Sequence, residues 1–326
     1  MQDESKRTLF FYALLVATLV PLLALPLLAA VAFPFNQSLL LALAIFAGGV
    51  GHVASTACVY ADKGVRDVMK PMKLRFYVLP LGCLLATGAA LVWGASLNLA
   101  KPAVTALFVI HLLWLHFHYQ KQNYGLVAFV GASQGARIPR VLSHLLLLPA
   151  LAGVLAVMTP LVRAAMEDQT LLTAQQPWLD RVALTTYLLG FLLIGRVVLK
   201  NRMAFASPRT AIFGLAAFLF FIPAVVLSHS EYAFWSYALA HGFQYLLMVF
   251  TMAGGAKPSL KIAIAFSISF IGGGFFLHRL AGNQALFICG ILLTWVHFVL
   301  DAKLWRMSEP GPRKLLRGRF GFFFPN

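Results

Sequence analysis

The stretch TLFFYALLVATLVPLLALPLLAAVAF, Thr8–Phe33, contains no charged residue in 26 positions. A helix needs about 20 apolar residues to cross the hydrocarbon core of a bilayer, so this stretch is long enough to span it. It is too long for the apolar core of a signal peptide, and no small-residue cleavage site precedes the next apolar run. We interpret it as a retained transmembrane helix.

The rest of the chain repeats this composition. Of its 326 residues, 60% are hydrophobic and only 11% are charged, and the mean hydropathy is +0.82, which is typical of an integral membrane protein. Further apolar runs bring the expected total to about ten transmembrane helices, at residues 8–33, 38–60, 75–98, 102–120, 138–162, 181–199, 209–228, 232–254, 259–279 and 283–305. We therefore predict an all-α fold, a polytopic helical bundle that forms a single domain over residues 1–326.

The basic residues predict the orientation of this bundle. The formal net charge is +16, and Lys and Arg gather in alternate loops, whereas the intervening loops are neutral or contain acids. The basic loops are residues 61–75, 131–140, 196–209 and 254–261, together with the tail after Asp301. By the positive-inside rule both termini are cytoplasmic, and we expect the membrane to be a bacterial inner membrane. Because the cations are scattered through short loops, we expect no nucleic-acid partner.

The C-terminal tail, residues 306–326, combines cations with phenylalanines in the sequence RKLLRGRFGFFFPN. Binding to anionic headgroups of the membrane lipid would explain this composition. A charge cluster that ends the last span, followed by an aromatic end, explains it equally well.

Histidines are concentrated at one level of the predicted bundle. The stretch HLLWLHFHYQKQNYG, His111–Gly125, holds three of the nine histidines in the chain. At about 1.5 Å per helical residue, His52, His241 and His297 lie roughly 15, 20 and 9 Å inside the cytoplasmic ends of their helices. Ordinary helix tilt makes these depths overlap with those of His111 and His118. Since polar groups deep in a membrane are costly and usually functional, we expect a shared polar pocket.

The spacing within each helix gives every buried imidazole a polar neighbour. Residues three, four or seven positions apart share one face of a helix. His116 points away from His111 and His118, on a stripe with Gln120 and Asn123. The pairs and triplets that share a face are His111 with His118 and Gln122, His241 with Gln244, His52 with Thr56, and His297 with Asp301.

This arrangement suits a metal ion. A neutral imidazole binds a metal through one ring nitrogen while the other is held by a carboxylate, amide or hydroxyl. Imidazole with carboxylate suits iron, and also copper or zinc. The three cysteines have unrelated spacings and predict no thiolate site. The candidate metal ligands are His52, His111, His116, His118, His241 and His297; the candidate cofactor-binding residues are Gln244 and Thr56; the candidate catalytic residues are Tyr119, Gln122 and Asp301.

Other uses of the same residues remain open at this stage. Two histidines could ligate a haem in an electron-transfer protein. His52, His111, His241 and Asp301 could instead relay protons in a proton-coupled transporter. Some of the histidines could simply form hydrogen bonds between helices.

The layout of these histidines resembles that of the histidine-rich integral membrane oxygenases and desaturases. It also resembles the Brp/Blh-type carotene-cleaving dioxygenases, in which helix-borne histidines hold a single iron. The desaturase boxes HxxxH and HxxHH are absent here, and the nearest patterns are His111-x4-His116-x-His118 and His297-x3-Asp301. Only His241-Gly242 matches part of the signature HGAxDH of the carotene dioxygenases. The membrane desaturases hold two metals with about eight or more histidines, whereas five or six are suitably placed here, so a single metal centre fits the count better.

These observations together predict a membrane-embedded, metal-dependent oxidoreductase, an oxygenase with iron as its metal. The expected substrate is a lipophilic small molecule that enters sideways from the bilayer. The sequence contains no ferredoxin, flavin or nicotinamide motif. An enzyme of this kind that needs electrons would therefore take them from a separate electron-donor protein, whereas a dioxygenase would need none.

Overall fold

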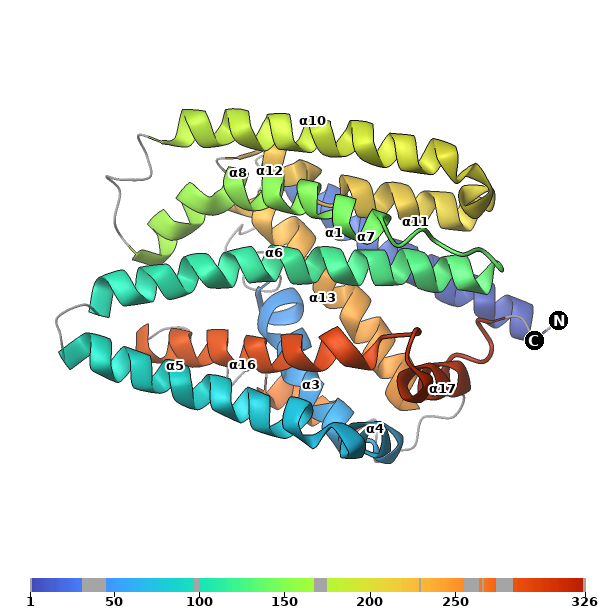
Figure 1. Cartoon of the computed structure of the whole chain (residues 1–326), viewed down its shortest axis with the longest axis horizontal. Coiled ribbons are helices and arrows are strands. Elements are labelled where there is room, and N and C mark those ends of the chain that lie inside the picture. The colour runs from blue at the N-terminus through green and yellow to red at the C-terminus, as the bar shows by residue number, and fades with distance from the viewer. Residues whose placement is uncertain are drawn as a thin grey trace. The chain divides into compact units, whose positions relative to one another are not determined.

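A computed structural model describes residues 2–30, 45–96, 100–166, 175–228, 230–254, 264–265, 267–273 and 284–324. These residues form helices and the turns between them, and no strand occurs among them (Figure 1). The prediction of an all-α fold is confirmed.

Helices occur in the predicted apolar runs as far as the structure describes them, and also in segments that were predicted as loops or tail, such as α4 and α17. In chain order they are α1 (Gln2–Ala30), η1 (Ile45–Gly51), α3 (His52–Ala61), α4 (Lys63–Met69), η2 (Lys70–Met72), η3 (Leu74–Val78), α5 (Leu79–Ser96), α6 (Ala100–Ser133), α7 (Leu142–Leu145), α8 (Leu147–Met166), α10 (Gln176–Lys200), η4 (Arg202–Phe205), α11 (Pro208–Leu219), α12 (Ile222–Val226), α13 (Glu231–Gly254), η5 (Ile268–Gly273), α16 (Gln284–Leu304) and α17 (Pro310–Arg319). The predicted end of one helix at residue 120 was too early, because α6 continues to Ser133. Its polar residues beyond that point are held by other parts of the chain, as when Lys121 Nζ donates to the carbonyl of Ser143 over 2.9 Å.

Four helical stretches among the described residues are long and apolar enough to cross a membrane. They are Glu4–Leu27, Leu142–Val162, Gln176–Lys200 and Pro208–Val226. This finding supports a membrane protein. The count of about ten crossings and the cytoplasmic position of both termini stay predictions.

The chain divides into two compact units. Unit 1 takes in residues 1–37, 105–241 and 324–326, and unit 2 takes in residues 38–104 and 242–323. The chain passes from one unit to the other within α6 and again within α13, directly after His241. The prediction of a single domain over residues 1–326 stays a prediction.

In unit 1, α8 packs along α10, and glycines allow the close approach. A Cβ atom at Gly190 of α10 would lie 3.1 Å from side-chain atoms of Leu148 and Pro149. A Cβ atom at Gly153 of α8 would lie 2.7 Å from the ring of Phe221, which immediately precedes α12. A side chain at Gly153 would clash with this ring, and one at Gly190 would require Leu148 and Pro149 to shift.

Also in unit 1, side chains satisfy the end of α11. The last carbonyls of a helix have no partner within it. The Tyr187 hydroxyl donates to the Phe218 carbonyl over 3.0 Å, and Gln120 Nε2 donates to the Ala217 carbonyl over 2.9 Å. These hydrogen bonds allow a buried break between α11 and α12. They also hold α6 and α10 against the end of α11.

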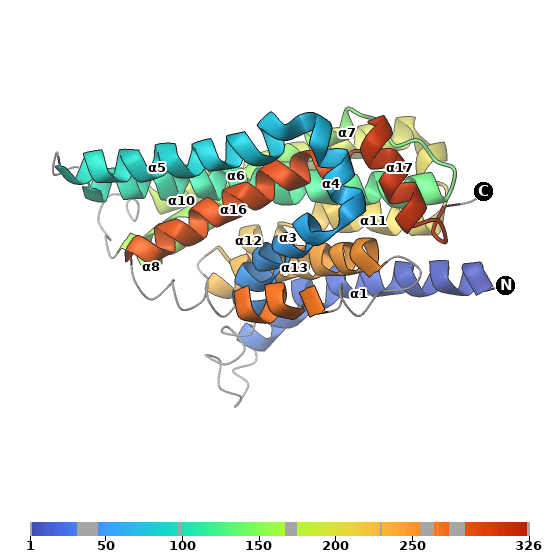
Figure 2. The same ribbon diagram turned by 90° about the horizontal axis from the view of Figure 1, so that it is seen from below.

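In unit 2, α3 packs against η1 and η5, and α16 lies beside α5 (Figure 2). A Cβ atom at Gly242 of α13 would lie 2.5 Å from Gly48 Cα, so two glycine backbones are in contact there. Gly48 belongs to the π-helix η1, and π-helical turns often occur at functional sites. The contact holds η1, and with it the start of α3, against α13.

The C-terminal tail is folded onto unit 2. Arg319 of α17 donates to Asp62 Oδ2 over 2.8 Å, and the other oxygen of Asp62 caps α4 by accepting from Val65 N over 3.0 Å. Leu316 and Phe320 are buried. This part of the tail therefore packs as a helix on α4, an arrangement that the sequence did not predict.

Candidate metal centre

His297 of α16 is the most completely buried imidazole among the residues of unit 2 that the structure describes. Its side chain is fully buried, and its Nδ1 lies 2.9 Å from Thr56 Oγ1 of α3. Its Nε2 lies 3.4 Å from Asp301 Oδ2, one turn later on the same helix. The predicted pair of His297 and Asp301 thus meets on one helical face, and Thr56 from another helix holds the opposite side of the ring.

Tyr245 connects these groups. Its hydroxyl lies 3.1 Å from Thr56 Oγ1, and Tyr245 also lies beside the carboxyl group of Asp301. The centroid of its ring lies 4.5 Å from that of His297, edge to face. Asp301 is held from its other side by Trp305, whose Nε1 donates to Oδ1 over 3.1 Å. Two hydroxyl groups, one carboxyl group and the rings of Tyr245 and Trp305 thus surround His297.

His52 adds a second imidazole to unit 2. It is the first residue of α3, directly after η1, and only 3% of it is exposed. Its ring centroid lies 5.1 Å from that of His297 and 5.8 Å from that of Tyr245, and both contacts are edge to face. The glycine contact that holds η1 against α13 therefore also positions His52.

In unit 1, α6 and α13 bring another pair of imidazoles together. The ring centroids of His118 and His241 are 4.9 Å apart, with the ring planes at 75°. The Tyr119 ring packs over His241 with centroids 4.1 Å apart, and Gln122 Nε2 donates to the His241 carbonyl over 3.2 Å. Both histidines are buried. His118 and Gln122 face the same helix, as their spacing of four residues predicts.

His116 has a different environment, although it is also buried in unit 1. Its Nδ1 lies 2.8 Å from the Leu112 carbonyl, and its Nε2 lies 2.8 Å from the Tyr237 hydroxyl. Because a carbonyl can only accept, Nδ1 donates to it and Nε2 accepts from Tyr237. Its ring also stacks on Phe221. A metal at His116 would have to displace Tyr237, so His116 is suited to packing.

The remaining predicted residues have less defined roles. His111 is buried on α6, two helical turns before His118, and Gln244 is buried on α13, three residues after His241. His229 and His278 lie outside the described residues. Sequence reasoning missed Tyr245 and Trp305, which are four residues after His241 and Asp301. The same spacing rule that paired His297 with Asp301 would have found both.

Each unit thus holds two buried imidazoles in ring contact, and unit 2 adds a buried carboxyl group. Nitrogen and oxygen donors of this kind fit iron, copper or zinc, and each set has hydrogen-bonding groups that orient it. The part of the chain that the structure describes therefore contains groups of histidine and aspartate side chains that could hold a metal ion.

Comparison of the chain with protein-family models, with curated proteins and with solved structures found no match.

Proposed function

We propose that the protein is a membrane-embedded, metal-dependent oxidoreductase that acts on a lipophilic substrate. The proposed metal ligands are His52, His241 and His297, with His118 of α6 as the fourth imidazole. The observation that carries the proposal is the setting of His297, which Thr56 holds through Nδ1 while Nε2 faces Asp301. Metal-binding histidines are typically held in this way.

The hydrogen bonds around His297 allow the direction of donation that a metal site requires. A hydroxyl can both donate and accept, so Thr56 can accept from the imidazole. In the proposed direction His297 donates to Thr56, and Thr56 donates to Tyr245. In this direction the proton of the imidazole is on Nδ1 and the lone pair is on Nε2. Nε2 is therefore the atom that a metal would bind.

Asp301 supports the same assignment. His297 Nε2 and Asp301 Oδ2 lie 3.4 Å apart, so one cation could contact both atoms. Trp305 holds the far carboxylate oxygen, so the near one points at the histidine. Asp301 is thus placed to contribute negative charge to a metal at His297, or to ligate it directly.

Helix α13 supports the inclusion of His241. His241 and Tyr245 are four residues apart on this continuous helix, so the helix presents both on one face. Tyr245 makes ring contacts with both His52 and His297. The rings of His118 and Tyr119 on α6 pack against the ring of His241. That these imidazoles share one ion is the central claim of the proposal.

The expected metal is iron, with copper, zinc or a haem as alternatives. When bound, iron with imidazole ligands and open positions supplies oxidation chemistry with dioxygen. The chain itself would keep water from the site, since His52, His241 and His297 are each at most 3% exposed. Tyr119 and Tyr245 would line the site and hold the imidazoles in place. A substrate from the bilayer would reach such a site without crossing water. A dioxygenase would need no electron donor, whereas any other oxygenase would take electrons from a separate electron-donor protein.

Elemental analysis tests the proposal directly. Protein purified without chelator should contain stoichiometric transition metal, and the visible absorption spectrum should show whether a haem is present. A His297→Ala variant should lose the metal, whereas a His144→Ala variant should keep it, because His144 is exposed. Wild-type protein without stoichiometric metal would contradict the proposal.

A proton-coupled transporter is the second candidate function. The network of His297, Thr56, Tyr245 and Asp301 is also a path along which a proton could move. This function predicts uptake into liposomes driven by a pH gradient, and it needs no metal. pH-driven flux in metal-free protein would favour it over the oxidoreductase.

A further inference from the structure

The C-terminal end of α10 in unit 1 carries a groove in an otherwise apolar surface. The groove has a volume of about 570 Å³ and is lined by Phe191, Leu192, Gly195, Arg196, Leu199 and Lys200. Its apolar residues point outward, since Phe191, Leu192 and Leu199 are between 57% and 77% exposed. An apolar surface of this kind on a helix long enough to cross a membrane is suited to contact with lipid chains.

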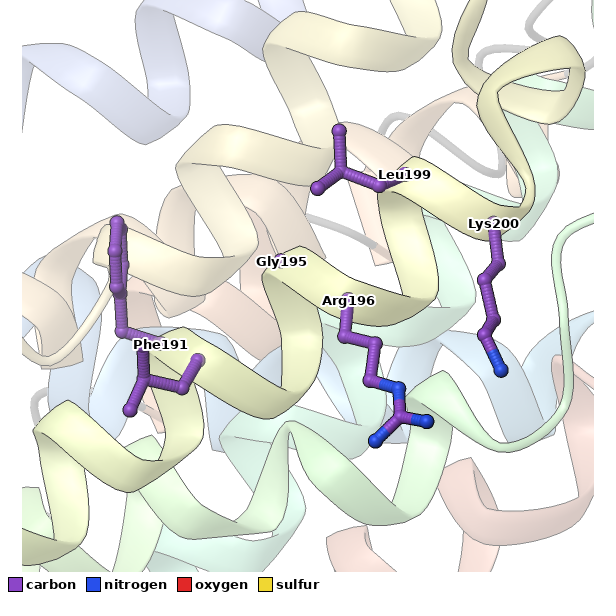
Figure 3. Close-up of a pocket in the computed structure, with 6 residues that line it drawn as sticks. Phe191, Gly195, Arg196, Leu199 and Lys200 are labelled. Atoms are coloured by element: carbon purple, nitrogen blue, oxygen red, sulfur yellow. The ribbon is translucent and has the colours of Figure 1, made fainter.

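Gly195 creates the groove. A Cβ atom at Gly195 would have no atom of the described chain within 4 Å, so nothing in the packing of α10 requires a glycine there. Gly190 on the same helix differs, because its missing side chain makes room for α8. Figure 3 shows Gly195 between Phe191 and Leu199 on the surface of α10. The absent side chain therefore leaves a notch that faces outward.

Two cations stand at one side of this notch. Arg196 and Lys200 are four residues apart, so they share a face of α10, and Figure 3 shows both side chains extending to the same side. Both are exposed, and neither has a hydrogen bond or an ion pair with the residues that the structure describes. Extension of single cations toward headgroups would explain each one separately. It does not explain the notch beside them.

We propose that this groove binds one anionic phospholipid. The phosphate group of the lipid would be held between Arg196 and Lys200, and an acyl chain would lie along Phe191 and Leu192 over the notch at Gly195. Two cations beside an apolar groove complement a molecule that carries negative charge at one end and hydrocarbon at the other. A second copy of this chain would bring the same two cations to the interface, where they would repel each other.

The test is native mass spectrometry of the protein after equilibration with equal amounts of phosphatidylglycerol and phosphatidylcholine. Wild-type protein should retain phosphatidylglycerol in preference. Removing one cation by Arg196→Gln or Lys200→Gln should lower this preference about five-fold, and the double variant should lose it further. Arg181→Gln, which removes an exposed cation from the opposite end of α10, should leave the preference unchanged.

Gly195→Leu tests the notch without removing charge. The new side chain meets no atom of the described chain, and leucine favours a helix more than glycine does, so folding should be preserved. We expect retained phosphatidylglycerol to fall while the thermal midpoint in detergent is maintained. Retention of phosphatidylglycerol at the wild-type level in Gly195→Leu and in the double charge variant would overturn the proposal. A change of oligomeric state with unchanged lipid retention would also overturn it, because the groove would then be an interface between copies.

Discussion

Nδ1 of His297 lies 2.9 Å from Oγ1 of Thr56, and these two residues are 241 positions apart in the sequence. The contact fixes which nitrogen of a fully buried imidazole is available to a ligand. It joins α16 to α3 at the residue that also faces Asp301 and His52. The oxidoreductase proposal depends on this contact more than on any other.

Replacing Thr56 by Val should weaken metal binding while preserving the shape of the site. The variant removes the hydroxyl that holds His297, and loss of such an orienting group typically lowers metal affinity about 10–100-fold. The measurement is competition with a chelator, followed by elemental analysis. Thr56→Ser keeps the hydroxyl and should retain most of the affinity. Equal losses in the two variants would show that the hydroxyl is not the cause.

Asp301→Asn should have a larger effect than Trp305→Phe. The first change removes the negative charge beside His297 Nε2, whereas the second removes only one hydrogen bond to the far oxygen of the carboxylate. We expect metal affinity to fall at least about 10-fold in Asp301→Asn and by less in Trp305→Phe. The same chelator competition measures both. A greater loss in Trp305→Phe would mean that Asp301 acts mainly in packing.

His118→Ala and His116→Ala should have opposite consequences. His118 is a proposed ligand, so its loss should lower the metal content. His116→Ala should leave the metal in place but lower the stability by about 1–3 kcal/mol, because the Tyr237 hydroxyl and the Leu112 carbonyl lose their buried partner. Elemental analysis and thermal unfolding of both variants make the comparison. Loss of metal in His116→Ala with retention in His118→Ala would contradict this prediction, because His116 would then be the ligand and His118 the packing residue.

Gly242→Ala should destabilise unit 2. The added methyl group would lie 2.5 Å from Gly48 Cα and 2.6 Å from Gly48 O, so η1 and α13 would have to separate. Such overpacking typically costs about 1–3 kcal/mol. Gly125→Ala on α6 is the matched control, because its Cβ atom meets nothing within 4 Å and alanine favours the helix. The thermal midpoint should therefore fall in Gly242→Ala and rise in Gly125→Ala. Equal midpoints in the two variants would contradict the close contact.

The long helices could be predicted from the sequence because a long run of apolar residues itself indicates a helix. Residues on one face of a helix could be predicted in the same way. The spacing of four residues that placed His118 beside Gln122 and His297 beside Asp301 is a local property of the helix. The helix end predicted at position 120 was wrong, because polar residues beyond it form contacts such as that of Lys121 with Ser143, which come from elsewhere in the chain.

The contacts between helices could not be predicted, because they join residues far apart in the sequence. Nothing near Asp62 indicates that Arg319 will bind it, and nothing near Thr56 indicates His297. The π-helical turn η1 that precedes His52 also has no periodic signal, and its Gly48 contacts Gly242, which is far away in the sequence. His116 shows the same limit, because its partner Tyr237 is 121 positions away.

The most direct test of the central claim is X-ray absorption at the edge of whichever transition metal the purified protein contains. If His52, His241 and His297 share one ion, the spectrum should show several imidazole ligands with metal-to-nitrogen distances of about 2.0–2.1 Å. The imidazole signal should fall in His52→Ala and in His241→Ala alike. A metal surrounded only by oxygen or sulfur ligands, or a signal that neither variant changes, would contradict a centre shared by these histidines.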